Sequence, residues 1–334
     1  MREVSVGEKI DQFALTELLA RSGMASIFKA TDTESGQTVV LKLPHPQYES
    51  DVVFFERFRR EELLGQRLEH PYVIKMLKPP AKSRMYIAME YIDGRSLRAE
   101  LQAKRALPTA RALEIARQVV EALVYLHANG VVHRDIKPEN ILLVGEHGLK
   151  ILDFGIALDE SARRLTWTGL SATIGTPDYM APEQVGGRRG DARTDVYSAG
   201  MLLYEMLTGE LPYAGPSAQA LMRAKATEEP TPPSYHLPTI DPALEMIILR
   251  AIARAPRDRY ATAQDLLADL RDPAAAALRA PEEERARAQA RARPLRRLIF
   301  PGAVVALLIG LGALVWVSHR TADVSVTAPS ARGR

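Results

Sequence analysis

Residues 18–30, LLARSGMASIFKA, are the first stretch whose residue types could do chemistry. The stretch has the small residues of a phosphate-binding loop, but Gly23 is its only glycine. Glycine suits such loops because it lets the backbone approach a phosphate closely and adopt positive φ. The strand-like run VVLK follows and ends at Lys42. These features raise the question of whether the chain holds a nucleotide and uses it.

A second group of chemical residues begins with HRDIKPEN at positions 133–140. Asp153-Phe154-Gly155 follows it, and Ala181-Pro182-Glu183 comes later. In this order and at these spacings, the motifs resemble those of the eukaryotic-like serine/threonine protein kinases found in bacteria. The resemblance extends over residues 13–270. It implies an enzyme that transfers the γ-phosphate of ATP to protein hydroxyls, with Mg²⁺, or Mn²⁺ in its place, as cofactor.

The resemblance also implies roles for the residues of these motifs. Asp135 would be the catalytic base, and Lys137 would contact the γ-phosphate. Asn140 and Asp153 would supply the hard oxygen ligands that Mg²⁺ prefers. Phosphoryl transfer depends mainly on positioning and on stabilising negative charge, so these few side chains would carry most of the catalysis.

Lys42 matches the family lysine that meets the α- and β-phosphates, and its partner should be a glutamate on the following helix. Three residues could serve: Glu56, Glu61 and Glu62. The pattern RFRREE resembles the family's helix and favours Glu61. Glu62 would point about 100° away around a helix, so only one of these two can be the partner.

The remaining nucleotide contacts are implied by the same resemblance. The first two glycines of the family's loop correspond to Ala20 and Ser22, and its last small position to Ala25. We expect a stiffer loop and weaker ATP affinity rather than an inactive enzyme, because these side chains are still small. The segment 89–92 would be the hinge that reads adenine. The predicted nucleotide-binding residues are Leu19, Ala20, Ser22, Gly23, Ile27, Lys42, Met89, Glu90 and Ile92.

Arg134, beside Asp135, suggests activation by phosphorylation, because a guanidinium can pair bidentately with phosphate. The activation-loop phosphosite candidates are Thr166, Thr168, Ser171 and Thr173. Thr176 matches a family threonine that faces the substrate. Arg134, Glu183, Asp195 and Arg259 are implied to be structural, with Arg259 paired to Glu183.

The elements that must position these residues follow from periodicity. Residues 10–92 read as strands, including 38–43 and 84–91, with one helix at 54–68. The helical period then dominates, and a helix is expected at 109–129 with a stop at Asn129-Gly130. Its expected buried face comprises Leu113, Ala116, Val120, Leu123 and His127. The sequence therefore predicts an α+β, two-lobed kinase domain at 10–271, with the lobes meeting near residues 92–93.

Composition and the C-terminal segment bound the remaining possibilities. The 334-residue chain has a net charge of +3, too small to indicate nucleic-acid binding, and its lack of cysteine excludes disulfides and cysteine-ligated zinc. Its N-terminal sequence has no apolar core of signal-peptide length. The uncharged run at 298–317 would span roughly 30 Å as a helix, enough to cross a membrane. We expect a single-pass cell-membrane protein with a juxtamembrane linker at 272–297 and a tail at 318–334.

Arginines precede this run at positions 285, 287, 291, 293, 296 and 297, which places the kinase domain in the cytoplasm and the tail outside. They could also bind anionic lipid. Gly302, Ala306 and Gly310 recur every four residues, so a homodimer is expected through this helix or through the N-lobe. Protein substrates are the other expected partners.

One alternative comes from a different functional class: a nucleotide-binding pseudokinase that acts as a scaffold. Degenerate kinases commonly lose the lysine, the base or the metal-binding aspartate. Here Lys42, Asp135, Asn140 and Asp153 are all present and only the phosphate-binding loop is altered, so the sequence favours the enzyme.

Overall fold

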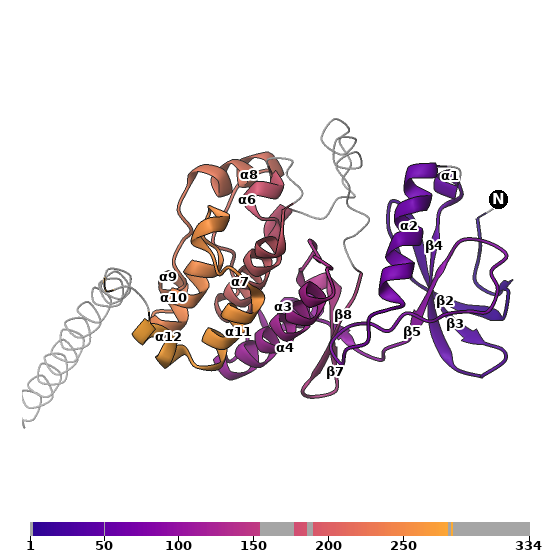
Figure 1. The fold of residues 1–334 in the computed structure, drawn as a ribbon, viewed down its shortest axis with the longest axis horizontal. Helices are drawn as coiled ribbons and strands as arrows, with labels where there is room; N and C mark the ends of the chain where they lie inside the picture. The colour runs from indigo at the N-terminus through magenta and orange to yellow at the C-terminus, as the bar shows by residue number, and fades with distance from the viewer. Residues whose placement is uncertain (1–2, 50, 154–176, 186–189, 280–281, 283–334) are drawn as a thin grey trace, which may run out of the picture. The chain divides into compact units, whose positions relative to one another are not determined.

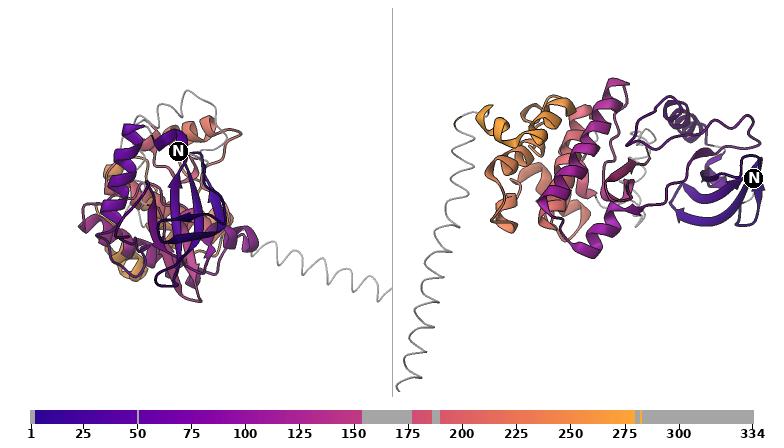
Figure 2. Two further views of the ribbon diagram at one scale, coloured as in Figure 1. Left: turned by 90° about the vertical axis from the view of Figure 1, so that its right-hand side faces the viewer. Right: turned by 90° about the horizontal axis from the view of Figure 1, so that it is seen from below.

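The structure is a computed structural model that describes residues 3–49, 51–153, 177–185, 190–279 and 282. Within residues 3–279 it has a strand-rich lobe followed by a helical lobe (Figure 1). The right-hand view of Figure 2 shows the same separation. The predicted α+β, two-lobed arrangement is therefore confirmed.

The N-terminal lobe is one antiparallel sheet with a long helix beside it. Its strands, in their order across the sheet, are β1 (Lys9–Ile10), β2 (Phe13–Arg21), β3 (Ala25–Asp32), β4 (Thr38–Pro44) and β5 (Ile87–Glu90). Its helices are α1 (Pro46–Glu49) and α2 (Val52–Gly65). The expected strand at 84–91 is shorter in the structure, because β4 pairs with β5 only as far as the Lys42–Ile87 position and beyond it pairs with β3 alone.

Strand β4 shows how this lobe aims its side chains. Val39 and Leu41 are buried in a core formed with β2, β3 and β5. Val40 belongs to a second core, which includes Phe58 of α2. Because side chains alternate between the two faces of a strand, Lys42 lies on the same face as Val40 and is directed toward α2.

Helix α2 begins two residues earlier than expected and ends three residues earlier. The side chain of Asp51 accepts hydrogen bonds from the backbone N–H groups of Val53 and Phe54, which caps the helix at its start. Phe58 and Glu61 lie on its buried face. The helix thus presents a buried carboxylate to the sheet.

The helical lobe contains a small three-stranded sheet and most of the helices. The strands are β6 (Arg95–Ser96), β7 (Ile141–Val144) and β8 (Gly148–Ile151). The longer helices are α3 (Leu97–Lys104), α4 (Thr109–Ala128), α7 (Ala192–Thr208), α8 (Ala218–Thr227), α10 (Pro242–Ala251) and α11 (Ala263–Arg271). The short helical elements are η1 (Pro138–Asn140), η3 (Pro177–Tyr179), α6 (Pro182–Val185), α9 (Pro233–His236), η4 (Pro256–Asp258) and α12 (Pro273–Arg279).

Helix α4 begins at its predicted residue and ends one residue earlier than predicted, and more of it is buried than expected. Asn129 caps the helix at its C-terminus. The next residue, Gly130, has φ +72°, a left-handed backbone conformation that suits glycine. Ala116, Val120 and Leu123 are buried as predicted, whereas Leu113 and His127 are only partly buried. The buried set also includes Ala112, Ile115, Val119, Ala122 and Leu126. The reason is that α4 packs against both α7 and α11, so two flanks of the helix are covered.

Packed helical structure continues past residue 271, the expected end of the kinase domain. Helix α12 lies inside the expected linker, yet it contacts α10 and α11 and buries Ala276. None of the helices that the structure describes is both long and apolar enough to cross a membrane. The expected span at 298–317, the tail at 318–334 and most of the linker lie outside the described residues.

Candidate active site

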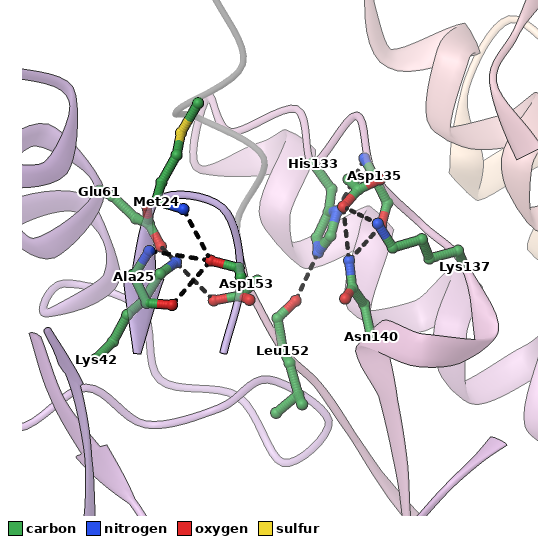
Figure 3. A network of polar contacts seen from close by, with 11 residues as sticks. Met24, Ala25, Lys42, Glu61, His133, Asp135, Lys137, Asn140, Leu152 and Asp153 are labelled. Atoms are coloured by element: carbon green, nitrogen blue, oxygen red, sulfur yellow. Dashed lines mark hydrogen bonds and ion pairs between the residues drawn. The ribbon is translucent and has the colours of Figure 1, made fainter. Parts of the chain in front are cut away.

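One partly buried lysine joins the two lobes at the candidate site. Lys42 Nζ donates to Glu61 Oε1 at 2.8 Å and to Asp153 Oδ1 at 2.9 Å (Figure 3). The neighbouring carboxylate, Glu62, pairs instead with Lys82. Of the two adjacent glutamates, the structure therefore brings Glu61 to Lys42 and directs Glu62 elsewhere, as the helical period requires.

The pKa values of Lys42, Glu61 and Asp153 shift in different directions. Burial raises the pKa of Glu61, and the Lys42 ammonium only partly opposes this effect. Burial would also raise the pKa of Asp153, but Lys42 outweighs it and the pKa is lowered. For Lys42, burial favours the neutral amine, yet Asp153 and Glu61 together raise its pKa. Lys42 is therefore a permanent cation held between two carboxylates.

The segment 133–140 brings a second group of polar side chains together. Lys137 Nζ donates to Asp135 Oδ2 at 2.7 Å, and Asn140 Nδ2 donates to the same oxygen at 2.9 Å. Asn140 Nδ2 also donates to the backbone oxygen of Asp135 at 2.8 Å. Asp135, Lys137 and Asn140 therefore form one cluster on the helical lobe (Figure 3).

A buried carboxylate on α7 holds this segment in an unusual backbone conformation. Arg134 has φ +67°, in a region of backbone conformation that residues other than glycine rarely occupy. Asp195, whose side chain is fully buried, accepts the backbone N–H of His133 at 2.8 Å and that of Arg134 at 2.6 Å. It also contacts His127 Nε2 at 2.8 Å. Long-range hydrogen bonds thus stabilise a strained turn directly before Asp135.

Asp153 has a similar strained backbone, with φ +44°. The preceding residue is tied to the segment 133–140 at two points. His133 Nε2 lies 3.0 Å from the backbone oxygen of Leu152, and the Leu152 N–H donates to the backbone oxygen of Asn140 at 2.8 Å. Asp153 and Asn140 are therefore positioned by the same network.

The donor set fits a divalent cation such as Mg²⁺. The Asn140 amide nitrogen is committed to Asp135, which fixes the orientation of the amide and leaves its oxygen as the ligand atom. Asp153 has a lowered pKa and remains a carboxylate at neutral pH. An amide oxygen and a carboxylate are ligands that Mg²⁺ accepts, usually together with phosphate oxygens and water.

The loop between β2 and β3, which the sequence predicted to bind phosphate, is closed by its own serine. Ser22 Oγ accepts the Ala25 N–H at 3.0 Å and lies 3.4 Å from the Met24 nitrogen, and it is also within 3.0 Å of the Ala25 backbone oxygen. The Ser22 N–H donates to the Ala25 oxygen at 2.8 Å. Backbone N–H groups that a nucleotide phosphate could use are therefore occupied by a side chain at a position where the family has glycine.

The other predicted nucleotide contacts lie on strands β2, β3 and β5 or directly beside them. Ala20 is paired with Ile27 across β2 and β3, and Leu19 and Gly23 are exposed. Met89 is paired with Val40, which lies two residues before Lys42 on the same face of β4. Glu90 Oε1 accepts from Lys150 at 2.8 Å, and Ile92 is partly buried. The structure thus arranges these residues along one sheet.

The implied structural pair is present within the helical lobe. Arg259 donates from Nη1 and Nη2 to the two oxygens of Glu183, each at 2.7 Å, and its side chain is fully buried. Burial would raise the pKa of Glu183, but the hydrogen bonds and charge of Arg259 lower it. Thr166, Thr168, Ser171, Thr173 and Thr176 lie outside the described residues.

Sequence reasoning missed several polar residues that support the site. Gln184 is buried and donates from Nε2 to the Arg134 backbone oxygen at 3.2 Å. Arg98 contacts Glu139, Glu205 and Tyr179 at 2.7–2.8 Å. Lys225 is buried beneath the segment 177–180. Only their polarity within otherwise apolar helical periods could have indicated them in the sequence.

Comparisons with known proteins agree with this geometry. Residues 13–270 match the protein kinase domain family. A probable serine/threonine-protein kinase of Streptomyces coelicolor, SCO3848, is 39% identical over 264 residues, which cover 78% of this chain and 39% of that protein. Serine/threonine-protein kinase PknB of Mycobacterium tuberculosis is 37% identical over 267 residues, which cover 78% of this chain and 42% of that protein. The chain thus spans about two fifths of the length of these curated relatives.

Solved structures show the same fold. The kinase domain of Mycobacterium tuberculosis PknI superposes with a TM-score of 0.63 at 24% identity, covering 81% of this chain and 100% of that one. Rad53 residues 1–466, solved in complex with AMP-PNP, give a TM-score of 0.62 at 26% identity, covering 77% of this chain and 64% of that one. The sequence match, the fold and the arrangement around Lys42 and Asp135 agree, and the chain belongs to the protein kinase domain family.

Proposed function

We propose that this chain is a serine/threonine protein kinase that transfers the γ-phosphate of ATP to hydroxyl groups of proteins. The observation that carries the proposal is the ion cluster of Lys42, Glu61 and Asp153, tied to the Asp135 cluster through Leu152. The named serine/threonine kinases among its relatives support the same activity and do not favour the scaffold alternative.

In this mechanism Asp135 orients the acceptor hydroxyl and takes its proton. The hydroxyl oxygen forms a bond to the γ-phosphorus, the bond from that phosphorus to the β–γ bridging oxygen breaks, and ADP leaves with the electron pair. Lys42 and Lys137 supply positive charge toward the phosphates. Asn140 and Asp153 would hold Mg²⁺, which neutralises phosphate charge when bound.

Labelling with radioactive ATP tests the activity. The full chain, incubated with ATP and Mg²⁺, should label itself or an added protein, and Asp135→Asn and Lys42→Met should abolish the label. Asp258→Asn and Lys75→Met are matched controls, because both side chains are largely exposed, and they should label like the parent. Nucleotide binding without label in the parent chain would support the pseudokinase scaffold instead.

The membrane anchor is a further part of the proposal, supported by the uncharged run at 298–317 and the arginines before it. The kinase domain would face the cytoplasm, and the arginines would lie against anionic lipid. Fractionation tests this placement: the full chain should sediment with membranes and resist salt extraction. Deletion of residues 298–334 should release an active kinase into the soluble fraction, and an unchanged distribution would contradict the anchor.

We also propose that the kinase phosphorylates itself in trans within a homodimer. The small-residue stripe Gly302, Ala306 and Gly310 supports close approach of two spans, with an N-lobe contact as the other route. Thr166, Thr168, Ser171 and Thr173 are the proposed acceptors. Gly302→Ile with Gly310→Ile should reduce crosslinking in membranes and slow self-labelling, and normal crosslinking would exclude the helix route.

A further inference from the structure

Lys225 of α8 is a fully buried lysine that the mechanism above does not use. Its Nζ donates to the backbone oxygens of Pro177 at 2.8 Å and Met180 at 2.9 Å, and also to that of Asp178. An ammonium has three N–H donors, so each one has a carbonyl partner. A lysine in this state is costly, and burial lowers the pKa of Lys225 to about 7, although the Asp178 carboxylate opposes the fall.

These bonds fix one short segment completely. Tyr179 is the one residue of 177–180 whose backbone oxygen Lys225 does not bind, and that oxygen accepts a hydrogen bond from Ser198 Oγ at 2.9 Å. Four consecutive backbone oxygens, 177–180, therefore bind buried side chains from α7 and α8. Backbone oxygens usually bind other backbone groups or water, so four consecutive oxygens bound by buried side chains form a specific anchor.

The anchored segment lies against the residues that would act on the acceptor hydroxyl. Four residues after the end of the segment, Gln184 donates from Nε2 to the backbone oxygen of Arg134, which precedes Asp135. On its other side, the Tyr179 hydroxyl accepts from Arg98, and Arg98 also binds Glu139. Both links end within the segment 133–140. The segment 177–180 is therefore connected to the segment that contains Asp135 at two points.

The same region has a hollow that a protein substrate could use. A cavity of about 420 Å³ is lined by Asp178 from the segment and by Ser217 and Leu221 at the start of α8. Residues within 205–215 line most of the rest of the cavity. Lys225 therefore connects two of the parts that form its wall.

A second buried cation reinforces the anchor. Lys225 Nζ lies 5.6 Å from the centre of the Tyr197 ring, and the Arg259 guanidinium lies 4.8 Å from the same ring. Arg259 holds Glu183, so the stretch 177–183 is fixed near both ends by cations that contact one aromatic side chain of α7.

We infer that Lys225 is a positioning residue for protein substrates, setting the backbone of residues 177–180 against which the acceptor chain binds. This inference rests on the kinase activity proposed above. It predicts an effect on the KM for the protein acceptor, with little effect on ATP.

Steady-state kinetics with the full chain test this inference, with myelin basic protein as the acceptor. Lys225→Met keeps the length and volume of the side chain but removes all three donors, so the KM for the acceptor should rise about tenfold or more. The KM for ATP and the slow hydrolysis of ATP by water should stay within about twofold of the parent values, because neither involves the segment. Lys225→Gln restores an N–H donor group and should recover part of the loss.

Arg223→Met is the matched control, because it removes a cation from the exposed side of the same helix, and its KM values should match those of the parent. An unchanged acceptor KM in Lys225→Met would overturn the inference. An equal fall in acceptor transfer and ATP hydrolysis, with a lower melting temperature, would also overturn it, because this would indicate a merely structural role.

Hydrogen exchange separates this inference from the proposed function. If the parent chain transfers no phosphate, the kinase proposal is at fault, and the exchange measurement alone decides the role of Lys225. Faster exchange of the amides at 178–185 in Lys225→Met, with α7 unchanged, supports the anchor, and unchanged exchange there contradicts it.

Discussion

The loop at 22–25 and the segment at 133–140 would meet the same nucleotide, but they are held in different ways. In the loop, Ser22 binds the backbone of Ala25, three residues away. In the segment, Asp195 binds the N–H groups of His133 and Arg134 from a helix more than 60 residues away in sequence. The first tie is local and partly exposed, whereas the second is buried.

This difference indicates that the loop at 22–25 and the segment at 133–140 have different roles in the site. Local, solvent-accessible hydrogen bonds exchange readily with water, so the loop can release its N–H groups to a phosphate at little cost. A buried carboxylate that satisfies several donors cannot be removed without leaving them unpaired. We therefore expect the loop to tune nucleotide affinity and the segment 133–140 to be rigid.

The largest effect is expected from breaking the rigid half of this comparison. Asp195→Ala removes the acceptor of two backbone N–H groups and of His127, so the free energy of unfolding should fall by about 3 kcal/mol or more. Urea denaturation measures the loss, and phosphate transfer should be abolished. Asp258→Ala, at an exposed aspartate, is the control. A loss below about 1 kcal/mol would show that the segment is held by other contacts.

The next largest effect concerns the ion cluster of Lys42, Glu61 and Asp153. Glu61→Gln replaces a buried charge that holds Lys42, so kcat should fall on the order of a hundredfold through misplacement of the lysine. Steady-state transfer assays measure it. Glu62→Gln is the control, because this adjacent carboxylate pairs with Lys82 and should leave kcat nearly unchanged. Equal losses in the two variants would contradict the assignment of Glu61.

The pH dependence sharpens the roles of the two carboxylates that bind Lys42. The pKa of Glu61 is raised and that of Asp153 is lowered, so Glu61 takes up a proton first as the pH falls. Protonation ends its ion pair with Lys42, and kcat/KM should fall up to about tenfold per pH unit below the pKa of Glu61. Asp153, by contrast, contributes stability that is present above its unfolded-state pKa and is lost only as the pH falls through its lower folded-state value.

A pH–rate profile measures this fall of kcat/KM at low pH, which is the acid limb of the profile. Glu61→Gln should remove the limb or move it to lower pH, while denaturant titrations should show the stability loss from Asp153 only at still lower pH. A limb that is identical in Glu61→Gln and the parent would assign it to a different group.

The smallest effect is expected from the local half of the comparison. Ser22→Gly releases the Ala25 N–H, so the KM for ATP should fall about fivefold, the equivalent of one neutral hydrogen bond. Ser22→Ala separates the causes, because it removes the hydroxyl without adding backbone freedom. A fall in both variants assigns the effect to the hydroxyl, whereas a fall in the glycine variant alone assigns it to flexibility. An unchanged KM in both would show that Ser22 does not compete with phosphate.

Much of the fold and of the candidate site follows from local patterns. Strand β4 and helix α2 were predictable from their periods, and together these periods aim Lys42 and Glu61 at each other. The choice of Glu61 over Glu62 needed only the 100° step of a helix and the resemblance of the surrounding pattern. The boundaries of α4 followed from its apolar spacing and its Asn-Gly stop.

Other features depend on contacts that no local pattern encodes. The wider burial of α4 arises because α7 and α11 cover two of its flanks, and the packing of α12 arises because α10 offers it a surface. Ser22 was expected to act through its size, whereas in the structure its hydroxyl binds the loop backbone. Gln184 and Lys225 act on backbone groups about 50 residues away in the sequence, which spacing cannot reveal.

By itself, the sequence supplied the residues for the proposed chemistry: a lysine, an acid and two candidate oxygen ligands. Of these, only Lys42 lies on an element whose period directs it inward. Only the tertiary structure decided how firmly each is held, since that depends on which buried groups satisfy the backbone around it. Asp195 and Lys225 show the reason. Each binds backbone atoms brought to it by packing, and backbone atoms are the same at every position of a sequence.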